Sequence, residues 1–360
     1  MGLSWVACSA KTGVVICDLP GLTVDRISTA ICAYTTATAS LLIEATTDPD
    51  WERGTLPGGA YLVALDGELP KWGAIITKRP RAFGKAVALS LATVEAYMDR
   101  RFISDDVSYT DEDQNAIIED LVDTYVGDSF PIRVEATASA TTRDRTYKKA
   151  SDKSIYSALV ELAGVIDGPE WTVGWEASLA VGGERMYTPV LYVADRLGTT
   201  PNEDMDPAVT FEHPGPVSSG TFTEDYSSGA GANDVLAVST AIADVRPESS
   251  HAVYADASRP TYELRFTPSE GISDIDTLDE HAEATLARVQ EGAVSLALVL
   301  DYGTAPKPGV DWTLGDVVGF RVTSPEFPGG LNGTARARGW SMSLGATPSI
   351  EPTLTEVTRG

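Results

Sequence analysis

The sequence has few cysteines and few histidines. Its three cysteines (Cys8, Cys17 and Cys32) all lie near the amino terminus, and none forms a Cys-x-x-Cys pair. An odd number of cysteines, together with only three histidines, favours neither a zinc site nor a disulfide framework. We therefore expect the cysteines to be small buried side chains in a protein of a reducing compartment.

The sequence also lacks a hydrophobic run of about 18 residues, so it predicts no transmembrane helix. The opening MGLSWVAC has no basic region, and its apolar run is too short for a lipoprotein signal. Val6 stands where N-myristoylation requires Ser or Thr. We expect a soluble protein without a membrane anchor.

Positive charge is scarce as well. The 360 residues include 52 acidic and 27 basic side chains, which gives a formal net charge of −25. Such a surface repels nucleic acid and anionic membranes, so it argues against sequence-specific nucleic-acid binding. The hydrophobic share of 43% is ordinary for a globular protein, and the length predicts two or three domains.

Two distant stretches share one pattern. Residues 317–322 and 334–344 read as strands around a Pro/Gly-rich turn at 325–333, and residues 61–65 and 73–77 read as strands around a turn at 66–70. Each hairpin carries a Gly and a Trp near its returning strand. The repetition predicts two related β-modules in one chain.

Most of the remaining chain alternates short strands with turns, and four segments have helical spacing. Predicted strands cover 5–9, 14–18, 28–36, 40–45, 86–91, 171–177, 190–193, 235–240, 262–266, 294–300 and the terminal stretch after 348. Helices are predicted at 93–100, 110–126, 153–164 and 278–291, with Thr110 and Thr277 as amino-terminal caps of the second and fourth. Residues 197–234 are rich in turn formers and predict a surface crossover.

No catalytic motif is present in its proper context. A nucleophile elbow, a P-loop, a dinucleotide-binding loop and a zinc helix are all missing. The glycines at 54–59 and 229–231 do not lie between a strand and a helix, so they predict ordinary turns. The sequence therefore predicts no catalytic, cofactor-binding or metal-binding residue.

The histidines are the natural candidates for a base near neutral pH. His213 lies in a Pro/Gly turn, His251 in a polar loop, and His281 on a helix beside two glutamates. None of them has a recognisable partner constellation, so we interpret all three as surface or boundary residues.

Acidic and aromatic side chains leave more alternatives open. The run Asp111, Glu112 and Asp113 suits a helix start. A second alternative is a calcium site, with oxygen ligands from Asn202, Glu203, Asp204 and Asp206. The central Gly and distal Glu of an EF-hand are missing there. Paired glycosidase carboxylates are not identifiable among 52 acids. Trp51, Trp72 and Trp171 either stack on sugars or pack in cores and interfaces.

Several stretches resemble the tail-hub minor tail proteins of long-tailed phages (siphoviruses) that infect actinobacteria. The resemblance rests on WGAIITKRPRA (72–82), EAYMDRRFI (95–103), the two middle helices, Gly-Pro-Glu-Trp (168–171), Leu-Gly-Asp-Val-Val (314–318) and Pro-Thr-Leu (352–354). It covers most of the chain.

The resemblance implies a mainly β fold with α+β insertions, related to phage baseplate hub proteins. Residues 1–92 and 201–360 are then two tube-type β-barrel modules, the second with one helix. Residues 93–200 form an α/β insertion domain between them.

It also implies a structural virion protein rather than an enzyme, without cofactors. Three chains would form a homotrimeric tail hub between the tail tube or distal tail ring and the tail tip, around part of the DNA channel. The implied partners are the distal tail, tail tube, tape measure and tail-tip or fibre proteins. The chain would be made in the bacterial cytoplasm and end in the virion, and an acidic wall would let DNA slide.

Two other functions remain as alternatives. One is a receptor- or glycan-binding adhesion module at the tail tip, which Trp51 and Trp171 would support if they flanked an exposed groove. The other is a cell-wall hydrolase that uses two carboxylates.

Overall fold

The computed structural model describes residues 2–84, 86–127, 129–200, 206–240, 246–255, 258–268, 272 and 274–360. The chain divides into two compact units. Unit 1 contains Met1–Ser219 and Leu298–Gly360, and unit 2 contains Gly220–Ala297. Within the described residues, no helix has the length and apolar character needed to cross a membrane.

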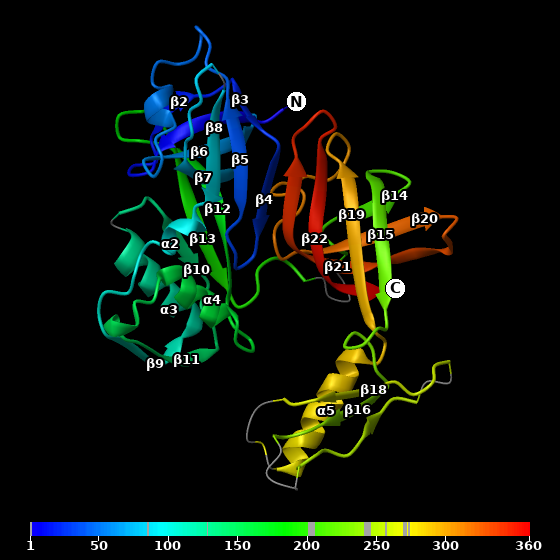
Figure 1. Cartoon of the computed structure of the whole chain (residues 1–360). Helices are drawn as coiled ribbons and strands as arrows, with labels where there is room; N and C mark the ends of the chain where they lie inside the picture. Colours follow the sequence, from blue (N-terminus) through cyan, green and yellow to red (C-terminus); the bar gives the residue numbers. More distant parts are fainter. Residues whose placement is uncertain are drawn as a thin grey trace. The chain divides into compact units, whose positions relative to one another are not determined.

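Unit 1 contains a first seven-stranded sheet with the order β2-β1-β6-β7-β8-β5-β3 (Figure 1). Its strands are β1 (Ser4–Ser9), β2 (Val15–Asp18), β3 (Leu22–Val24), β5 (Thr36–Leu41), β6 (Ala60–Asp66), β7 (Leu69–Lys78) and β8 (Val87–Thr93). The predicted hairpin at 61–77 is confirmed as β6 and β7. A four-residue helix, α1 (Trp51–Gly54), precedes it.

The strands predicted at 28–36 and 40–45 are wrong in their bounds. The structure has β4 (Arg26–Ala30), a turn, and then β5, which ends at Leu41. β4 pairs with a strand of the other large sheet, whereas β5 pairs with β3 and β8 of the first sheet. The break between residues 30 and 36 lets the chain pass from one sheet to the other. The β-branched residues on both sides of it favour strand, so the sequence predicts one continuous strand there.

The middle block of unit 1 is α/β and packs on the first sheet. It comprises α2 (Glu95–Met98), β9 (Val107–Asp113), α3 (Gln114–Val122), a π-helical turn (Asp123–Gly127), β10 (Arg133–Ala136), β11 (Thr142–Tyr147), a 3₁₀ turn (Lys149–Ser151), α4 (Ile155–Ala163), β12 (Glu170–Leu179) and β13 (Arg185–Ala194). β10, β13 and β12 form a three-stranded sheet in that order. Ile117, Leu159 and Trp171 share one core with Val6 and Tyr61 of the first sheet.

The helix predicted at 110–126 begins later than predicted, as α3. Thr110 is not its cap, because residues 107–113 form β9, which pairs with β11. Asp113 is the cap instead: its Oδ1 accepts hydrogen bonds from the backbone N–H of Asn115 (2.7 Å) and Ala116 (3.2 Å). Cross-strand pairing therefore overrides the helix-start preference of the acidic run. The predicted apolar stripe, which includes Ile117 and Leu121, is buried as expected.

A second large sheet occupies the rest of unit 1, in the order β14-β20-β21-β22-β19-β15, with β4 added to β21. Its strands are β14 (Thr210–His213), β15 (Val217–Asp225), β19 (Ala293–Asp301), β20 (Val317–Ser324), β21 (Phe327–Ser343) and β22 (Ser349–Arg359). β14 and β15 lie inside the stretch that was predicted as a crossover. β15 and β19 are the strands along which the chain passes into and out of unit 2.

The predicted turn at 325–333 is also wrong, because β21 already begins at Phe327. Ser324 pairs with Phe327, so the turn is only two residues long. Gly333 lies within the strand, where a Cβ atom would stand 2.0 Å from the carbonyl oxygen of Thr358. The glycine therefore permits the close approach of neighbouring strands. In the sequence alone, such a glycine cannot be distinguished from one that forms a turn.

The two large sheets repeat one strand path. The first contains β6-β7-β8-β5-β3 in spatial order, and the second contains β20-β21-β22-β19-β15. Both sets also follow the same order along the chain. In the first set β4 is inserted between β3 and β5, and in the second set unit 2 is inserted between β15 and β19.

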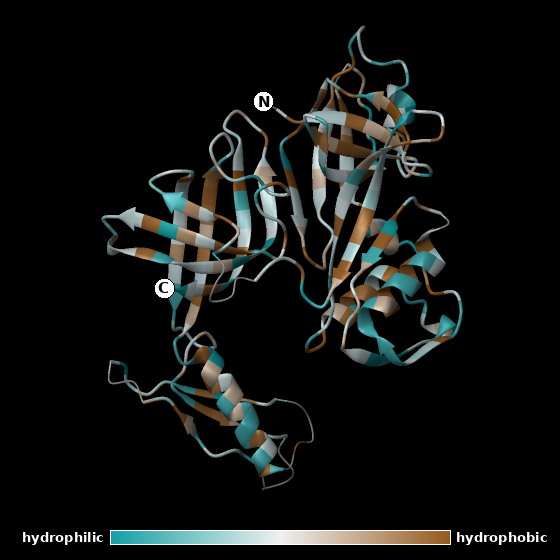
Figure 2. Ribbon diagram, turned by 180° about the vertical axis from the view of Figure 1, so that it is seen from behind, coloured by the Kyte–Doolittle hydropathy of each residue, from teal (hydrophilic) through white to brown (hydrophobic). Residues whose placement is uncertain are grey.

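The described residues of unit 2 form a small sheet and one helix. β16 (Asp234–Ala237) pairs with β17 (Ala252–Val253) and β18 (Glu263–Phe266), and α5 (Ile275–Val289) supplies Leu278 and Ala282 to their core. Figure 2 shows hydrophobic and hydrophilic residues alternating along this helix. Asp274 caps it by accepting from the Thr277 N–H at 3.0 Å, so the helix starts three residues before the predicted position.

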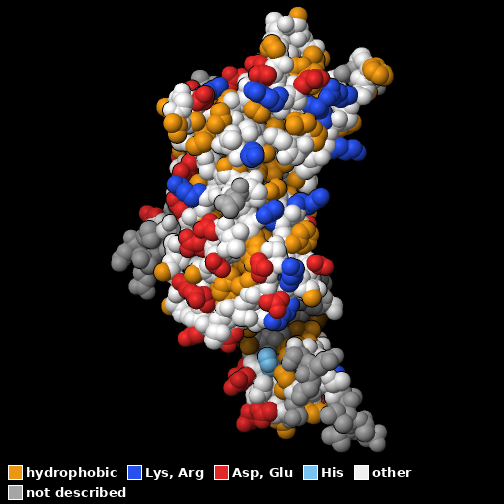
Figure 3. All heavy atoms as spheres, turned by 90° about the vertical axis from the view of Figure 1, so that its left-hand side faces the viewer, with side chains coloured by type: hydrophobic (Ala, Val, Ile, Leu, Met, Phe, Trp, Pro, Cys, Tyr) orange, Lys and Arg blue, Asp and Glu red, His pale blue; other side chains and the backbone are white. Residues whose placement is uncertain are grey.

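The two units do not coincide with the predicted domains. The helix assigned to the 201–360 module belongs to unit 2, and the 1–92 and 93–200 segments share a core in unit 1. The three-domain division stays a prediction. On the face drawn in Figure 3, acidic and basic side chains are interspersed with hydrophobic ones.

Candidate functional site: the junction of the two large sheets

A single strand joins the two large sheets of unit 1. β4 follows β3 of the first sheet, but it pairs antiparallel with β21 of the second, with Ala30 opposite Gly339 and Thr29 opposite Trp340. A Cβ atom on Gly339 would lie 2.8 Å from the Thr29 carbonyl oxygen, so glycine permits the close approach. At the strand's start, Arg26 forms an ion pair with Glu351 at 2.6 Å.

The first sheet holds the same strand from its other side. Trp72 on β7 donates its indole N–H to the carbonyl of Ser28 at 2.8 Å, and Thr35 donates its hydroxyl to the same carbonyl at 2.5 Å. Trp5 packs edge-on against Trp72, with ring centroids 6.2 Å apart. The tryptophans of the two similar hairpins, Trp72 and Trp340, therefore both lie at β4.

A buried ion pair links the second sheet to the middle block. Arg336 on β21 is 1% exposed, and both of its terminal nitrogens donate to the carboxylate of Glu170 on β12. Arg336 also donates to the carbonyls of Gly315 and Leu197, each at 3.0 Å. Burial is the largest single influence and raises the pKa of Glu170, but the hydrogen bonds from Arg336 and the Leu197 N–H, together with the charges of Arg336 and Arg338, hold the pKa below its usual range.

Two glycines let the loops around this ion pair cross. Gly198 and Gly315 have φ angles of +76° and +93°, a region that favours glycine. A Cβ atom on Gly198 would lie 2.1 Å from the carbonyl carbon of Gly315, and one on Gly315 would lie 2.1 Å from the Leu197 oxygen. The backbones are thus in direct contact, which places both carbonyls within reach of Arg336.

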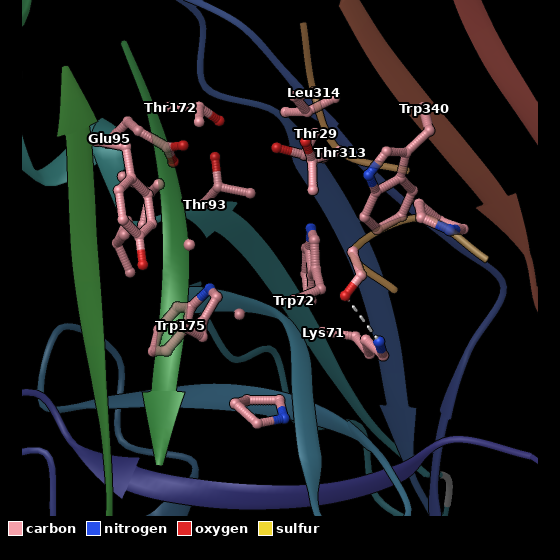
Figure 4. Close-up of a pocket in the computed structure, with 18 of the residues that line it drawn as sticks. Thr29, Lys71, Trp72, Thr93, Glu95, Thr172, Trp175, Thr313, Leu314 and Trp340 are labelled. Carbon is pink, nitrogen blue, oxygen red and sulfur yellow. Dashed lines mark hydrogen bonds between the residues drawn. The ribbon is translucent and has the colours of Figure 1, made fainter. Parts of the chain in front are cut away.

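A cavity of about 460 Å³ opens beside these contacts. Its walls come from β4, β7, β8, β12, β13, the start of α2, residues 197–198, the 308–314 loop and β21 (Figure 4). Glu95 and Lys71 are the charged side chains among its described lining residues. Trp72, Trp175 and Trp340 supply aromatic walls.

Glu95 is the unusual group of this cavity, because it is only 2% exposed and has no ion-pair partner among the described residues. Burial raises its pKa from 4.5 to about 7, although hydrogen bonds from the Thr93 side chain and the Val173 backbone favour the charged form. At neutral pH the folded protein therefore keeps part of this carboxyl protonated.

The raised pKa predicts a specific pH dependence. Between pH 4.5 and 7 the folded state keeps a proton that the unfolded state has released, so this group's stabilising contribution is lost as the pH rises through 7. A Glu95→Gln variant has no ionisable group at this position, so it does not lose this stability as the pH rises. We expect its free energy of unfolding to match the wild type near pH 4.5 and to exceed it by about 3 kcal/mol at pH 8.

Urea unfolding of both proteins from pH 4.5 to 8 measures this difference, and carboxylates elsewhere in the chain cancel in the comparison. Tryptophan fluorescence is a suitable signal, because all seven tryptophans belong to unit 1. A stability difference that does not change with pH would contradict the pKa assignment.

The described contacts give each of the three histidines a different local environment. His213 ends β14, with its Nδ1 2.8 Å from the Val217 carbonyl oxygen. His251 and His281 lie in unit 2; His251 contacts Asp234 at 2.5 Å, and His281 is exposed on α5. The described contacts give none of them a nucleophile or a second carboxylate.

The proposed calcium ligands lie largely outside the described residues. Asn202, Glu203 and Asp204 are not described, and Asp206 is exposed. Elsewhere in the described chain, no group of three or more His, Cys, Asp or Glu side chains has a metal-binding arrangement. Asp111 accepts a hydrogen bond from Thr142 at 2.6 Å, which ties β9 to β11.

The three tryptophans considered above for sugar stacking all pack against other residues of the protein. Trp171 is 0% exposed and lies in the core, so it flanks no exposed groove. Trp72 is buried beside β4, as described above. Trp51 is half-buried, and the guanidinium groups of Arg79 and Arg81 lie 6.0 and 5.6 Å from its ring centroid.

The cysteine prediction is confirmed for Cys8 and Cys17, which are buried, whereas Cys32 is half-buried. All three are free thiols. Burial raises the pKa of Cys17 to about 12 and that of Cys32 to about 11, so these thiols stay protonated and unreactive at neutral pH.

Comparison with known proteins identifies the fold. No protein-family model matches the sequence, and no curated protein matches it. Among solved structures, a tail protein from Neisseria meningitidis MC58 is similar over 99% of this chain and 97% of its own, at 12% identity and a TM-score of 0.52. The 43 kDa tail protein of prophage MuSo2 from Shewanella oneidensis is similar over 98% of both chains, at 9% identity and a TM-score of 0.57.

A chain of the Francisella PdpA–VgrG complex is similar over 98% of this chain and 57% of its own, at 7% identity and a TM-score of 0.50. The chain thus has the mainly β fold of these tail proteins, along nearly its full length. The similar proteins come from Neisseria, Shewanella and Francisella, and they give no support to an actinobacterial host.

Proposed function

We propose that this chain is a structural component of a phage tail, of the baseplate-hub type, and not an enzyme. The observation that carries the proposal is the fold, which extends over 98% or more of this chain and 97% or more of two tail proteins. The repeated strand path of the two large sheets supports it, because a hub with two related modules per chain needs such a repeat.

The proposed assembly is a homotrimeric ring. Three chains with two related sheets each would supply six equivalent sheets, which matches the sixfold tail tube that the hub is expected to continue. β2 and β3 are the outer strands of the first sheet's path, and β14 and β15 are those of the second. Outer strands carry unpaired backbone groups that bind a neighbouring strand, so they are suited to ring closure.

The position in the virion and the partners belong to the same proposal. The ring would lie at the tail tip, between the tail tube or distal tail protein and the tip or fibre proteins, with the tape measure protein and DNA passing through it. A chain with a net charge of −25 would line such a channel without holding phosphates. The siphovirus type and the actinobacterial host stay predictions.

Native mass spectrometry of the purified chain and electron microscopy of virions test the assembly. We expect a trimer in the virion, and a trimer or a weak monomer–trimer equilibrium in solution, since partner rings stabilise assembly by mass action. Monomers alone, in solution and in virions, would contradict the hub proposal.

The adhesion and hydrolase alternatives gain no comparable support. The adhesion hypothesis would have gained from an exposed groove flanked by Trp51 and Trp171, but Trp171 is fully buried. For the hydrolase, Glu95 is the buried acid with a strongly raised pKa, but no second carboxylate lines its cavity among the described residues.

A further inference from the structure

The cavity at the sheet junction has two sides of different chemistry. Figure 4 shows the side-chain oxygens of Glu95, Thr93 and Thr172 close together on one side. Trp72 lies across the cavity from them, and Trp340 lies beyond it. A carboxyl group that faces aromatic rings across a hollow is an arrangement that recognises a positively charged group with an apolar body.

Two buried oxygens on the polar side have unused hydrogen-bonding capacity. Glu95 Oε2 and Thr172 Oγ1 are both buried, and neither has a hydrogen-bond partner among the described residues. Leaving such an atom unpaired costs about 1–3 kcal/mol, and more when the group is charged. Folded proteins leave few buried polar atoms unpaired, so two in one cavity indicate donors from a bound molecule.

The basic residue of the cavity does not neutralise Glu95. Lys71 donates to the Gly309 carbonyl at 3.4 Å, and Figure 4 shows it on the far side of Trp72 from Glu95. Tyr192 is the other titratable lining side chain. Glu95 therefore lies in the cavity as an acidic group without an internal cation.

The aromatic walls are held in place by the packing of the sheets. Trp175 lies against β7, where a Cβ atom on Gly73 would come within 2.2 Å of its ring. Trp72 is anchored by its hydrogen bond to Ser28, and Trp340 is mostly buried. Walls fixed in this way lose little side-chain entropy when a ligand binds.

We propose that this cavity binds an organic cation, namely a guanidinium or ammonium group on a short alkyl chain. The cationic N–H groups donate to Glu95 and Thr172, and the alkyl body lies against Trp72 and Trp175. A guanidinium suits the walls best, because it is planar, weakly hydrated and stacks on aromatic rings. The volume of about 460 Å³ is in the range of small-molecule sites.

The first test is a titration of the full-length protein with n-butylguanidinium at pH 8, followed by calorimetry and tryptophan fluorescence. We expect saturable binding, and binding of the neutral n-butylurea at least about 10-fold weaker, since a charge-assisted hydrogen bond is worth about 1.5–3 kcal/mol. Equal binding of the two compounds, or no saturation by low millimolar concentrations, would overturn the proposal.

Variants of the polar side locate the site. Glu95→Gln has nearly the same shape, and we expect it to weaken n-butylguanidinium binding at least about 10-fold. Thr172→Val is expected to weaken it by a smaller factor. Near-ultraviolet circular dichroism checks that both variants are folded. Unchanged affinity in a folded Glu95→Gln protein would refute the site.

Lys71→Met is the matched control on the opposite side of the cavity. We expect it to leave cation affinity unchanged or higher, because it removes a like charge. Tight binding of n-pentanoate that disappears in Lys71→Met would instead make the cavity an anion site and reject the proposal.

The cation has two sources that the experiment separates: a free small molecule, or an arginine or lysine side chain of another protein chain. The peptide Gly-Gly-Arg-Gly-Gly is compared with its neutral citrulline analogue and with n-butylguanidinium. Tighter binding of the arginine peptide than of the free cation assigns the cavity to a partner's side chain, and the reverse order assigns it to a small molecule. Both results support a cation site, whereas equal binding of the citrulline peptide contradicts it.

Discussion

Replacing Arg336 with alanine is expected to lower the free energy of unfolding of unit 1 by about 3–5 kcal/mol. The substitution removes the bidentate partner of a carboxylate that is itself largely buried, since the Glu170 side chain is 12% exposed, and leaves it only the longer contact with Arg338 at 3.6 Å. It also removes the donor to the Gly315 and Leu197 carbonyls. The cost comes mainly from the buried charge and acceptors that remain, rather than from the lost attraction.

The exposed pair of Arg321 and Glu212 provides the matched control. It also joins strands of the second sheet, at 2.9 Å, but its side chains are 67% and 47% exposed. Arg321→Ala is expected to cost less than about 1 kcal/mol. Urea unfolding followed by tryptophan fluorescence compares the two, and equal losses would show that the Arg336 pair is not a buried link.

A double variant separates charge from packing. Arg336→Met together with Glu170→Leu removes both charges and keeps apolar volume at the site. We expect it to recover most of the stability that Arg336→Ala loses, because replacing a whole buried ion pair by hydrophobic residues is often neutral. If the double variant were as unstable as Arg336→Ala, the loss would have another origin.

Replacing Gly198 or Gly315 with alanine is expected to lower the free energy of unfolding by about 2–5 kcal/mol. One part is backbone strain, since alanine in a left-handed conformation costs about 1–2 kcal/mol. The other part is steric, because each new Cβ atom would lie 2.1 Å from backbone atoms of the opposite loop. Overpacking of this kind typically costs about 1–3 kcal/mol.

A Gly58→Ala variant is the control that measures the backbone strain without the steric contact. It has a φ of +70°, and a Cβ atom there would meet nothing within 4 Å. Gly58→Ala is therefore expected to cost only about 1–2 kcal/mol. The same urea experiment measures all three variants. If Gly198→Ala and Gly315→Ala proved no more harmful than Gly58→Ala, the two loops would not be in the close contact described.

Elements with a clear local period could be predicted from the sequence. The stripe with Ile117 and Leu121 marks a helix, because burial of one face imposes that spacing, and the short apolar run of β6 marks a strand that is buried on both faces. The predictions failed where distant pairing decides the outcome. Thr110 suits a helix cap, yet β9 pairs with β11; the glycines after 325 suit a turn, yet β21 pairs with β20 and β22.

The junction could be predicted only in part. The hairpin similarity pointed to Trp72 and Trp340, which both line the cavity. Glu95 gave no signal, because a single acid among 52 is not distinguished until its burial is known. The pair of Arg336 and Glu170 spans 166 residues of sequence, and no local pattern connects such positions.

The crossing of β4 has a consequence for how the chain is synthesised. Arg26 and its neighbour Ser341 on β21 are 315 residues apart, so the ribosome makes β4 long before its pairing strand. At about 5–20 residues per second, the delay is about 15–60 s. During this time a nascent strand next to a nearly complete first sheet has no backbone partner, and such strands are prone to aggregate. The second large sheet cannot be completed until β22 has left the ribosome, so chaperone binding to the first sheet and β4 would matter most in that interval.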